Sequence, residues 1–155
     1  MTDRAFLMNV GDFALTEYQN YTFNSFVFFD GSYWGAGPDG IYKLTGTTDD
    51  GSNIAWSFRT GMLDGKKQGL KRLEEILLSM RFNGPVTLRV WVDDDLWYDY
   101  NLANYREDVL HVVRAKLGRG LRSKYFRVEV SGVDNTVAEV SSIDVPMIPL
   151  KRRIG

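Results

Sequence analysis

The chain contains no cysteine and a single histidine, His111, among its 155 residues. Without cysteine the protein can form neither a disulfide framework nor a thiolate metal site. One histidine leaves no second strong nitrogen ligand for zinc. The residues that flank His111 are apolar, and no Gly-x-Ser-x-Gly nucleophile motif accompanies it. We therefore interpret His111 as a structural histidine and expect neither a metal nor a cofactor.

Long hydrophobic runs are also missing. No segment approaches the roughly 18 consecutive apolar residues that a membrane-spanning helix needs, so we expect no membrane partner. The first residues, MTDRAFLMNVGDF, have no long apolar run behind a basic start and so do not resemble a signal peptide. We expect the protein to be made and folded in a cytoplasm.

Aromatic residues, by contrast, are abundant, at 14% of a chain that is 44% hydrophobic. Aromatic side chains favour strands and interfaces, so this composition predicts a β-rich protein that buries surface against partners. Charge is uneven: residues 1–64 carry 8 acidic and 3 basic side chains, and residues 65–155 carry 12 and 16. This asymmetry suits head-to-tail contacts between copies, although scatter in a highly charged chain explains it equally well.

Residues 23–46, FNSFVFFDGSYWGAGPDGIYKLTG, have the pattern of strands joined by tight turns. Phe26 and Phe28 alternate before the hairpin signal Asp30-Gly31, and Pro38-Asp39-Gly40 marks a second turn. Nothing in the segment is chemically reactive. It is typical of a sheet built for packing.

Tight turns divide the first 45 residues into four short apolar runs. The predicted strands are 5–10, 13–18, 23–29 and 32–44. Together they predict a small four-stranded, blade-like meander, whose faces must be covered by other chain. The polar residues 45–53 read as a linker. We therefore predict two domains, residues 1–45 and residues 46–155.

The second part has short strands at the spacing typical of a β-sandwich or jelly roll. Alternation predicts strands over 54–58 and 124–130, and residues 86–100 form a hairpin around Asp93-Asp94-Asp95. Pro146 and Pro149 restrict the last strand to a sheet edge. The predicted fold class is all-β: an antiparallel β-sandwich or jelly-roll-like domain preceded by the meander.

Two segments of this part are ambiguous between helix and strand. Residues 70–82 contain good helix formers at helical spacing, but they also alternate cleanly, and the β context favours a strand. Residues 109–117 fit either a strand or a short helix. We expect this element to end at Gly118-Arg119-Gly120.

None of the polar clusters carries a convincing catalytic pattern. Asp93-Asp94-Asp95 lacks the alternate ligand spacing and glycine of a calcium loop, so it predicts a polar hairpin tip. The glycine-rich residues 35–40 lack the Lys-Ser/Thr of a phosphate-binding loop. The neighbours Glu74 and Glu75 would point to opposite faces of a strand, which argues against a paired-carboxylate site. We expect no enzymatic activity.

Two groups of residues are candidates for binding. The aromatic group could form a sugar-stacking platform, although core or interface packing is the commoner role of such residues. The basic group, within residues 114–127, could contact another subunit, bind nucleic acid or be a solvated face. The aromatic group is Tyr33, Trp34, Trp97 and Tyr98, and the basic group is Arg114, Lys116, Arg119, Arg122, Lys124 and Arg127.

The order of motifs from about Gly40 to Ile154 resembles structural proteins of tailed bacteriophages and prophages. In those proteins a blade-like segment with the pattern GIY.LTG.TDDG precedes a β-sandwich, and the chain ends near V.LSRR. The corresponding segments here are DGIYKLTGTTDDGSNIAWSFRTGMLDGKKQGLKRLEEILLSM, GPVTLRVWVD, KLGRGLRSKYFRVEV and SSIDVPMIPLKRRI.

The resemblance implies a non-enzymatic virion component of the tail, baseplate or neck. Its expected partners are other virion proteins and further copies of itself, as a homo-oligomer or multi-copy ring assembled in the bacterial host cytoplasm. It assigns no catalytic residues. The alternatives are a carbohydrate-binding or host-recognition module of a virion and, with less support from the charge pattern, a nucleic-acid-contacting neck protein.

Overall fold

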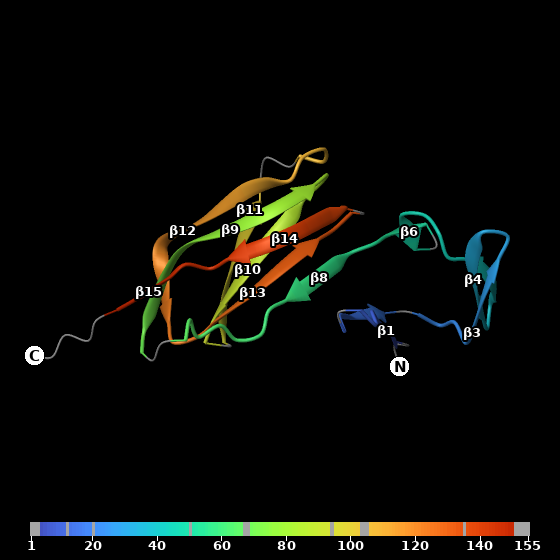
Figure 1. Ribbon diagram of the computed structural model, residues 1–155, viewed down its shortest axis with the longest axis horizontal. Coiled ribbons are helices and arrows are strands. Elements are labelled where there is room, and N and C mark those ends of the chain that lie inside the picture. Colours follow the sequence, from blue (N-terminus) through green and yellow to red (C-terminus); the bar gives the residue numbers. More distant parts are fainter. Residues whose placement is uncertain are drawn as a thin grey trace, which may run out of the picture. The chain divides into compact units, whose positions relative to one another are not determined.

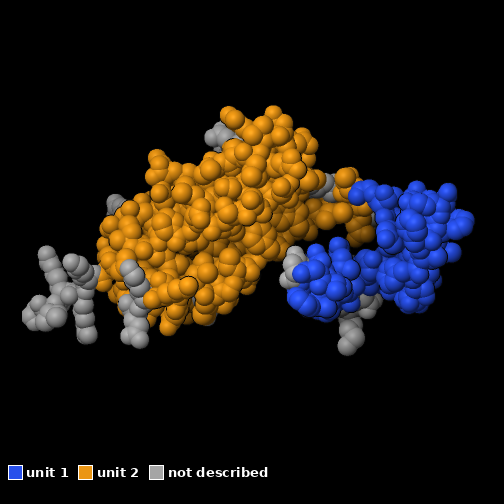
Figure 2. All heavy atoms as spheres, in the orientation of Figure 1, with its two compact units in different colours: residues 1–46 blue, residues 47–155 orange. Residues whose placement is uncertain are grey.

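The computed structural model describes residues 4–11, 13–19, 21–49, 51–66, 69–93, 95–102, 106–134 and 136–150. The side chain of Arg119 lies outside this description. The chain divides into two compact units, residues 1–46 (unit 1) and residues 47–155 (unit 2), which Figure 2 shows in different colours. Every regular element of the described residues is a β-strand, and all strand pairs are antiparallel, which confirms the predicted all-β fold class.

Unit 1 contains two separate small sheets. β1 and β2 form a hairpin, and β3, β4 and β5 form a three-stranded sheet in that order. The turn between β3 and β4 places Asp30 at φ 48° and Gly31 at φ 69°, as a two-residue type I′ hairpin requires. The strands are β1 (Arg4–Met8), β2 (Leu15–Gln19), β3 (Ser25–Phe29), β4 (Ser32–Gly37) and β5 (Gly40–Lys43).

The predicted single four-stranded meander is therefore wrong in detail. The stretch 32–44 forms two strands, because Pro38 fixes its own φ and lacks an N–H while Gly40 adopts φ 152°. Residues 23–24 were predicted to begin the third strand, but they lie outside β3. The Phe23 ring instead packs over Gly35 of β4. The predicted linker holds only a minimal hairpin, β6 (Thr48–Asp49) with β7 (Ser52–Asn53).

Besides the small β6–β7 hairpin, the described residues of unit 2 form two larger sheets, visible as two layers in Figure 1. Sheet I has the order β11-β10-β13-β8, and sheet II has the order β12-β9-β14, with β15 also paired to β9. The strands of sheet I are β8 (Trp56–Arg59), β10 (Val86–Val92), β11 (Leu96–Leu102) and β13 (Phe126–Gly132). Those of sheet II are β9 (Lys71–Phe82), β12 (His111–Ser123), β14 (Ala138–Asp144) and β15 (Met147–Pro149).

The core of unit 2 lies between these sheets and follows the two-residue period of its strands. It consists of Leu73, Ile76, Leu78, Met80, Phe82, Val86, Leu88, Val90, Leu102, Val113, Ala115, Leu117, Phe126, Val128 and Val130. The side chains between these buried positions point outward, and most of those on the outer faces are polar or aromatic, with Leu77 and Val112 of sheet II as apolar exceptions. The predicted sandwich is confirmed, as is the predicted edge position of the proline-containing β15.

The two ambiguous segments are both strands. Residues 71–82 form β9, the central strand of sheet II, as the alternation of buried positions 76, 78, 80 and 82 requires. The expected break at Gly118-Arg119-Gly120 is wrong, because β12 continues to Ser123. Its pairing with β9 shifts register between Lys116 and Leu121. Gly118 and Gly120 adopt φ 67° and 80°, so these glycines build a bulge rather than an end.

The sequence predicted no membrane-spanning helix. In the described part of the chain, no helix has the length and apolarity needed to cross a bilayer.

The units differ sharply in how much apolar surface they bury, which leads to a folding prediction. We expect residues 47–155, expressed alone, to unfold cooperatively in urea, because unit 2 contains its own core. We expect residues 1–46 alone to show no cooperative transition. Near-UV circular dichroism during urea titration measures both. A cooperative transition in the 1–46 fragment would contradict this assignment of the core.

Gly132 provides a test of packing at the end of sheet I. A Cβ there would lie 2.6 Å from two atoms of the Trp56 indole, which is held by an N–H···O bond of 2.6 Å to the Thr136 carbonyl. We therefore expect Gly132→Ala to destabilise unit 2 by about 1–3 kcal/mol through overpacking. Urea unfolding gives the value. Gly61→Ala is the control, since its Cβ would have no neighbour within 4 Å, and an equal loss in both variants would refute the clash.

Candidate interaction surfaces

One face of the three-stranded sheet in unit 1 is a continuous aromatic cluster. Strand pairing places Phe26, Phe28, Tyr33 and Tyr42 on this face. Tyr21 joins the cluster from the segment before β3, stacked on Phe26 with ring centroids 5.8 Å apart. The remaining contacts, with centroid separations of 4.8 to 6.2 Å, join Tyr18 to Tyr21, Tyr21 to Phe23, Phe23 to Phe26 and Tyr42, and Phe28 to Tyr33.

Phe23 can join this aromatic cluster only because residue 35 is glycine. A Cβ on Gly35 would lie 2.8 Å from the Phe23 ring, so any larger residue would displace the ring. Gly35 is also the only residue in the described part of unit 1 that is classed as buried. Partial burial raises the pKa of Tyr21, with a further contribution from Tyr18. The cluster is thus ordered by ring contacts, yet Phe26, Phe28 and Tyr33 remain more than half exposed.

The opposite face of the same sheet is apolar as well. Val27, Phe29, Trp34 and Ile41 share it with Lys43. The Trp34 indole donates a hydrogen bond of 3.2 Å to the Phe29 carbonyl, and the Lys43 ammonium lies 5.9 Å from the indole centroid. Phe29 is 68% exposed and Ile41 73%. Tyr33 and Trp34, two members of the predicted aromatic group, therefore lie on opposite faces.

In unit 2 the predicted aromatic pair is also divided. The register of β10 and β11 places Trp97 opposite Trp91 on the outer face of sheet I, and Tyr98 opposite Val90 on the inner side. Trp97 belongs to a cluster that the sequence did not single out, the tryptophan–arginine cluster of Trp91, Trp97, Arg59 and Arg89. The sequence did contain a pattern that indicates this cluster, because Arg89 and Trp91 occupy positions that alternate with the buried residues of β10.

The tryptophan–arginine cluster stacks guanidinium groups on indole rings. The two indole centroids lie 4.9 Å apart at 45°. Arg59 lies 4.9 Å from the Trp91 centroid, and Arg89 lies 5.9 Å from Trp91 and 5.5 Å from Trp97. Such contacts are favourable because the cation faces the negative face of the ring. The buried Trp91 indole N–H has no acceptor in the described residues.

Carboxylates hold both arginines of this cluster in place. Arg89 donates two hydrogen bonds to Asp99, of 2.6 and 2.8 Å, and Arg59 donates one of 2.6 Å to Glu129. Hydrogen bonding from Arg89 holds the pKa of Asp99 below its usual range despite partial desolvation. The same hydrogen bond raises the pKa of Arg89. The charges of the cluster are therefore largely balanced within it.

The predicted basic group is dispersed. Arg114, Lys116 and Arg122 lie on the outer face of sheet II, where Arg114 forms an ion pair with Glu75. Lys124 precedes β13, and Arg127 is on sheet I opposite Trp91. The Arg119 side chain lies outside the described residues. The structure thus brings three of the six together, beside acidic Glu74 and Glu75. The prediction that these two glutamates point to opposite faces is wrong, because the alternation of β9 shifts between buried Leu73 and Ile76.

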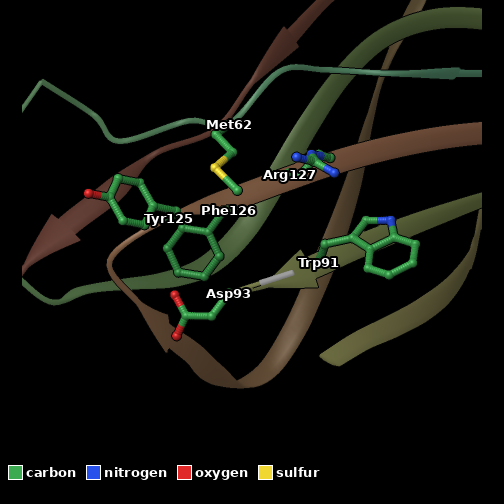
Figure 3. A pocket seen from close by; sticks show the side chains of 6 residues that line it. All are labelled: Met62, Trp91, Asp93, Tyr125, Phe126 and Arg127. Atoms are coloured by element: carbon green, nitrogen blue, oxygen red, sulfur yellow. The ribbon is translucent and has the colours of Figure 1, made fainter. Parts of the chain in front are cut away.

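Two of the hollows among the described residues lie on unit 2. The first, lined by Met62, Trp91, Asp93, Tyr125, Phe126 and Arg127, is too narrow for a water molecule, and in Figure 3 Trp91 and Tyr125 stand at opposite ends of the group. The second is an open groove of about 480 Å³ between the edge strands β8 and β14. Trp56, Phe58, Val140 and Ile143 supply its apolar lining, with Ser141 and Ser142 beside them.

The remaining candidates for chemistry have structural contacts. The His111 ring stacks on Phe82, and its Nδ1 lies 3.2 Å from the Val109 carbonyl. Asp93 adopts φ 53° in the tight turn that was predicted, and its carboxylate accepts a hydrogen bond from buried Ser123. Asp94 lies outside the described residues. Among those described, no group of three or more His, Cys, Asp or Glu side chains is arranged to hold a metal ion.

Comparison with known proteins adds no further constraint: no family model, curated protein or solved structure matches the chain. The surfaces themselves are therefore the basis for a functional conclusion.

The Arg89–Asp99 pair predicts a pH dependence. Because the folded pKa of Asp99 lies below its ordinary value of 3.8, the pair stabilises the fold above that value. This contribution is lost as the pH falls through the lower, folded pKa. Carboxyl chemical shifts in an NMR titration should show the depressed midpoint.

We expect Arg89→Gln to move the Asp99 midpoint upward, toward 3.8. Arg81→Gln is the matched control, since Arg81 pairs with Glu139 on the other sheet, at 2.6 Å. An Asp99 midpoint that stays unchanged in Arg89→Gln would show that another group depresses it.

Proposed function

We propose that this chain is a non-enzymatic structural subunit of a tailed-phage particle, from its tail, baseplate or neck. It acts by protein–protein contacts in a multi-copy assembly with other virion proteins. The observation that carries the proposal is the exposure of large apolar side chains on both faces of the three-stranded sheet in unit 1. The resemblance of the sequence motifs to phage structural proteins is the reason for proposing a phage particle.

Exposed apolar surface of this kind is costly for an isolated monomer. Patches larger than a few hundred Å² generally mark interaction sites, because water around them is released on association. Phe28 and Tyr33 on the aromatic face are 61% and 63% exposed, and the opposite face presents Phe29 and Ile41. A sheet that is apolar on both faces needs a covering layer on each. Partner proteins in an assembly would supply such layers.

The other candidate functions have less support. A sugar-stacking platform requires open ring faces, whereas Arg59 and Arg89 lie over the indole rings of Trp91 and Trp97. A nucleic-acid surface requires basic side chains gathered together. Here three share a face with Glu74 and Glu75, and Arg127 lies on the other sheet. We therefore favour assembly over recognition of glycans or nucleic acid.

Light scattering of the purified full-length protein, at low and moderately high salt, tests the proposal. We expect a mass of several copies, or a monomer that assembles as concentration or salt changes. The double variant Phe28→Ser/Tyr33→Ser should lower the mass, because it removes apolar area from the aromatic face.

The matched control is Val112→Ser, an apolar residue on β12 of unit 2 that is 63% exposed. It should assemble as the unaltered protein does. A protein that stays monomeric at every salt and concentration would refute the proposed function.

A further inference from the structure

The outer edge of β3 differs from the other edges of this protein. The strand reads Ser-Phe-Val-Phe-Phe, without charge, proline or glycine, and it pairs only with β4. The edges of sheet II are interrupted by register shifts in β12 and β14 and by Pro149 in β15. β5, at the opposite edge of the same sheet, is four residues long and ends at Lys43. Bulges, prolines and charges protect edges from pairing, and β3 has none of them.

The hydrogen-bond pattern shows which backbone groups this edge offers. The Leu44 N–H donates to the Tyr33 carbonyl, at 2.8 Å, so the polar groups of Tyr33 point toward β5. Polar groups alternate along a strand, so those of Trp34 point toward β3, where its partner is Val27. The N–H and C=O groups of Phe26 and Phe28 must then point to the free edge.

From this arrangement we propose that β3 pairs antiparallel with β3 of a second copy, about a two-fold axis at Val27. The axis places Val27 opposite Val27 of the second copy, and Phe26 opposite its Phe28. Phe26 and Phe28 form the hydrogen-bonded pairs, so four backbone hydrogen bonds join two three-stranded sheets into one sheet of six strands.

The side chains agree with this register. Phe26 and Phe28 lie on the same face of β3, so each cross-strand pair joins two aromatic rings, a favourable combination. The pairing makes the aromatic clusters of both copies continuous. On the opposite face it places Ser25 beside Phe29 and Val27 beside itself. The contact is self-complementary, as a two-fold interface must be.

A second copy fits this edge better than a different protein does. The edge is uncharged, so it carries no electrostatic signal for a partner of opposite sign. This inference rests on the proposed function, because it specifies one contact within the multi-copy assembly. Both faces of the six-stranded sheet remain available for other virion proteins.

The absence of cysteine allows a direct test in the full-length protein. Val27 would form a non-hydrogen-bonded pair, with Cα atoms about 4.5 Å apart. That separation lies within the range of about 4.4–6.8 Å for disulfides. Under mild oxidation, Val27→Cys should form a covalent dimer. Ile41→Cys, on the same face at the β5 edge, should stay largely uncrosslinked. Equal or slower crosslinking of Val27→Cys would overturn the inference.

Charge exchange provides a second, non-covalent test. Val27→Lys and Val27→Glu should each lower the mass measured by light scattering, because like charges then meet at the axis. An equimolar mixture of the two should restore the mass, and Val112→Lys, at an exposed position of β12 in unit 2, should leave it unchanged. Urea unfolding of unit 2 in each variant checks that the sandwich remains folded.

These experiments separate the two proposals. If the unaltered protein assembles, Val27→Cys does not crosslink preferentially and Val27→Lys retains the full mass, the β3 pairing is wrong while the proposed function stands. If the unaltered protein stays monomeric under all conditions, the proposed function fails, and the pairing fails with it.

Discussion

The burial of alternate side chains between two sheets is the constraint on which unit 2 depends. Fifteen buried apolar side chains of the described residues meet there, and most outer positions hold polar or aromatic residues. Unit 1 has the same alternation but no second layer, because its longest sheet has three short strands. Small sheets cannot cover their own apolar faces. The contrast explains how one chain can contain both a unit with a buried core and a unit whose apolar faces are exposed.

Local pattern predicted most strands correctly, and its failures have physical causes. In β9 the alternation of Ile76, Leu78 and Met80 outweighed good helix formers, because the strand pairs on both sides and is buried on one face. Glycine usually ends an element, yet at Gly118 and Gly120 the chain uses positive φ to continue with a bulge. In the meander, sequence showed the strands but not how they divide into sheets.

The interaction surfaces were harder to predict, because they depend on register between distant segments. Trp97 was identified, but its neighbours Arg89 and Trp91 come from another strand, and Arg59 reaches Trp91 through the pairing of β8 with β13. No local pattern indicates that Arg59 lies opposite Glu129, seventy positions later. Tyr33 and Trp34 were grouped because they are adjacent in sequence, but successive side chains of a regular strand point to opposite faces.

The order of the strands along the chain also has a consequence for synthesis. β8 pairs only after β13 has been made, and the first residues of β9 gain their second partner only with β15. Pairings this distant in sequence are slow to form. The apolar hairpins of unit 1 leave the ribosome before unit 2 and need no later segment for their own ladders. A nascent chain therefore exposes the apolar strands of unit 1 before unit 2 has folded. This exposure favours chaperone binding or early encounters between copies on one polysome.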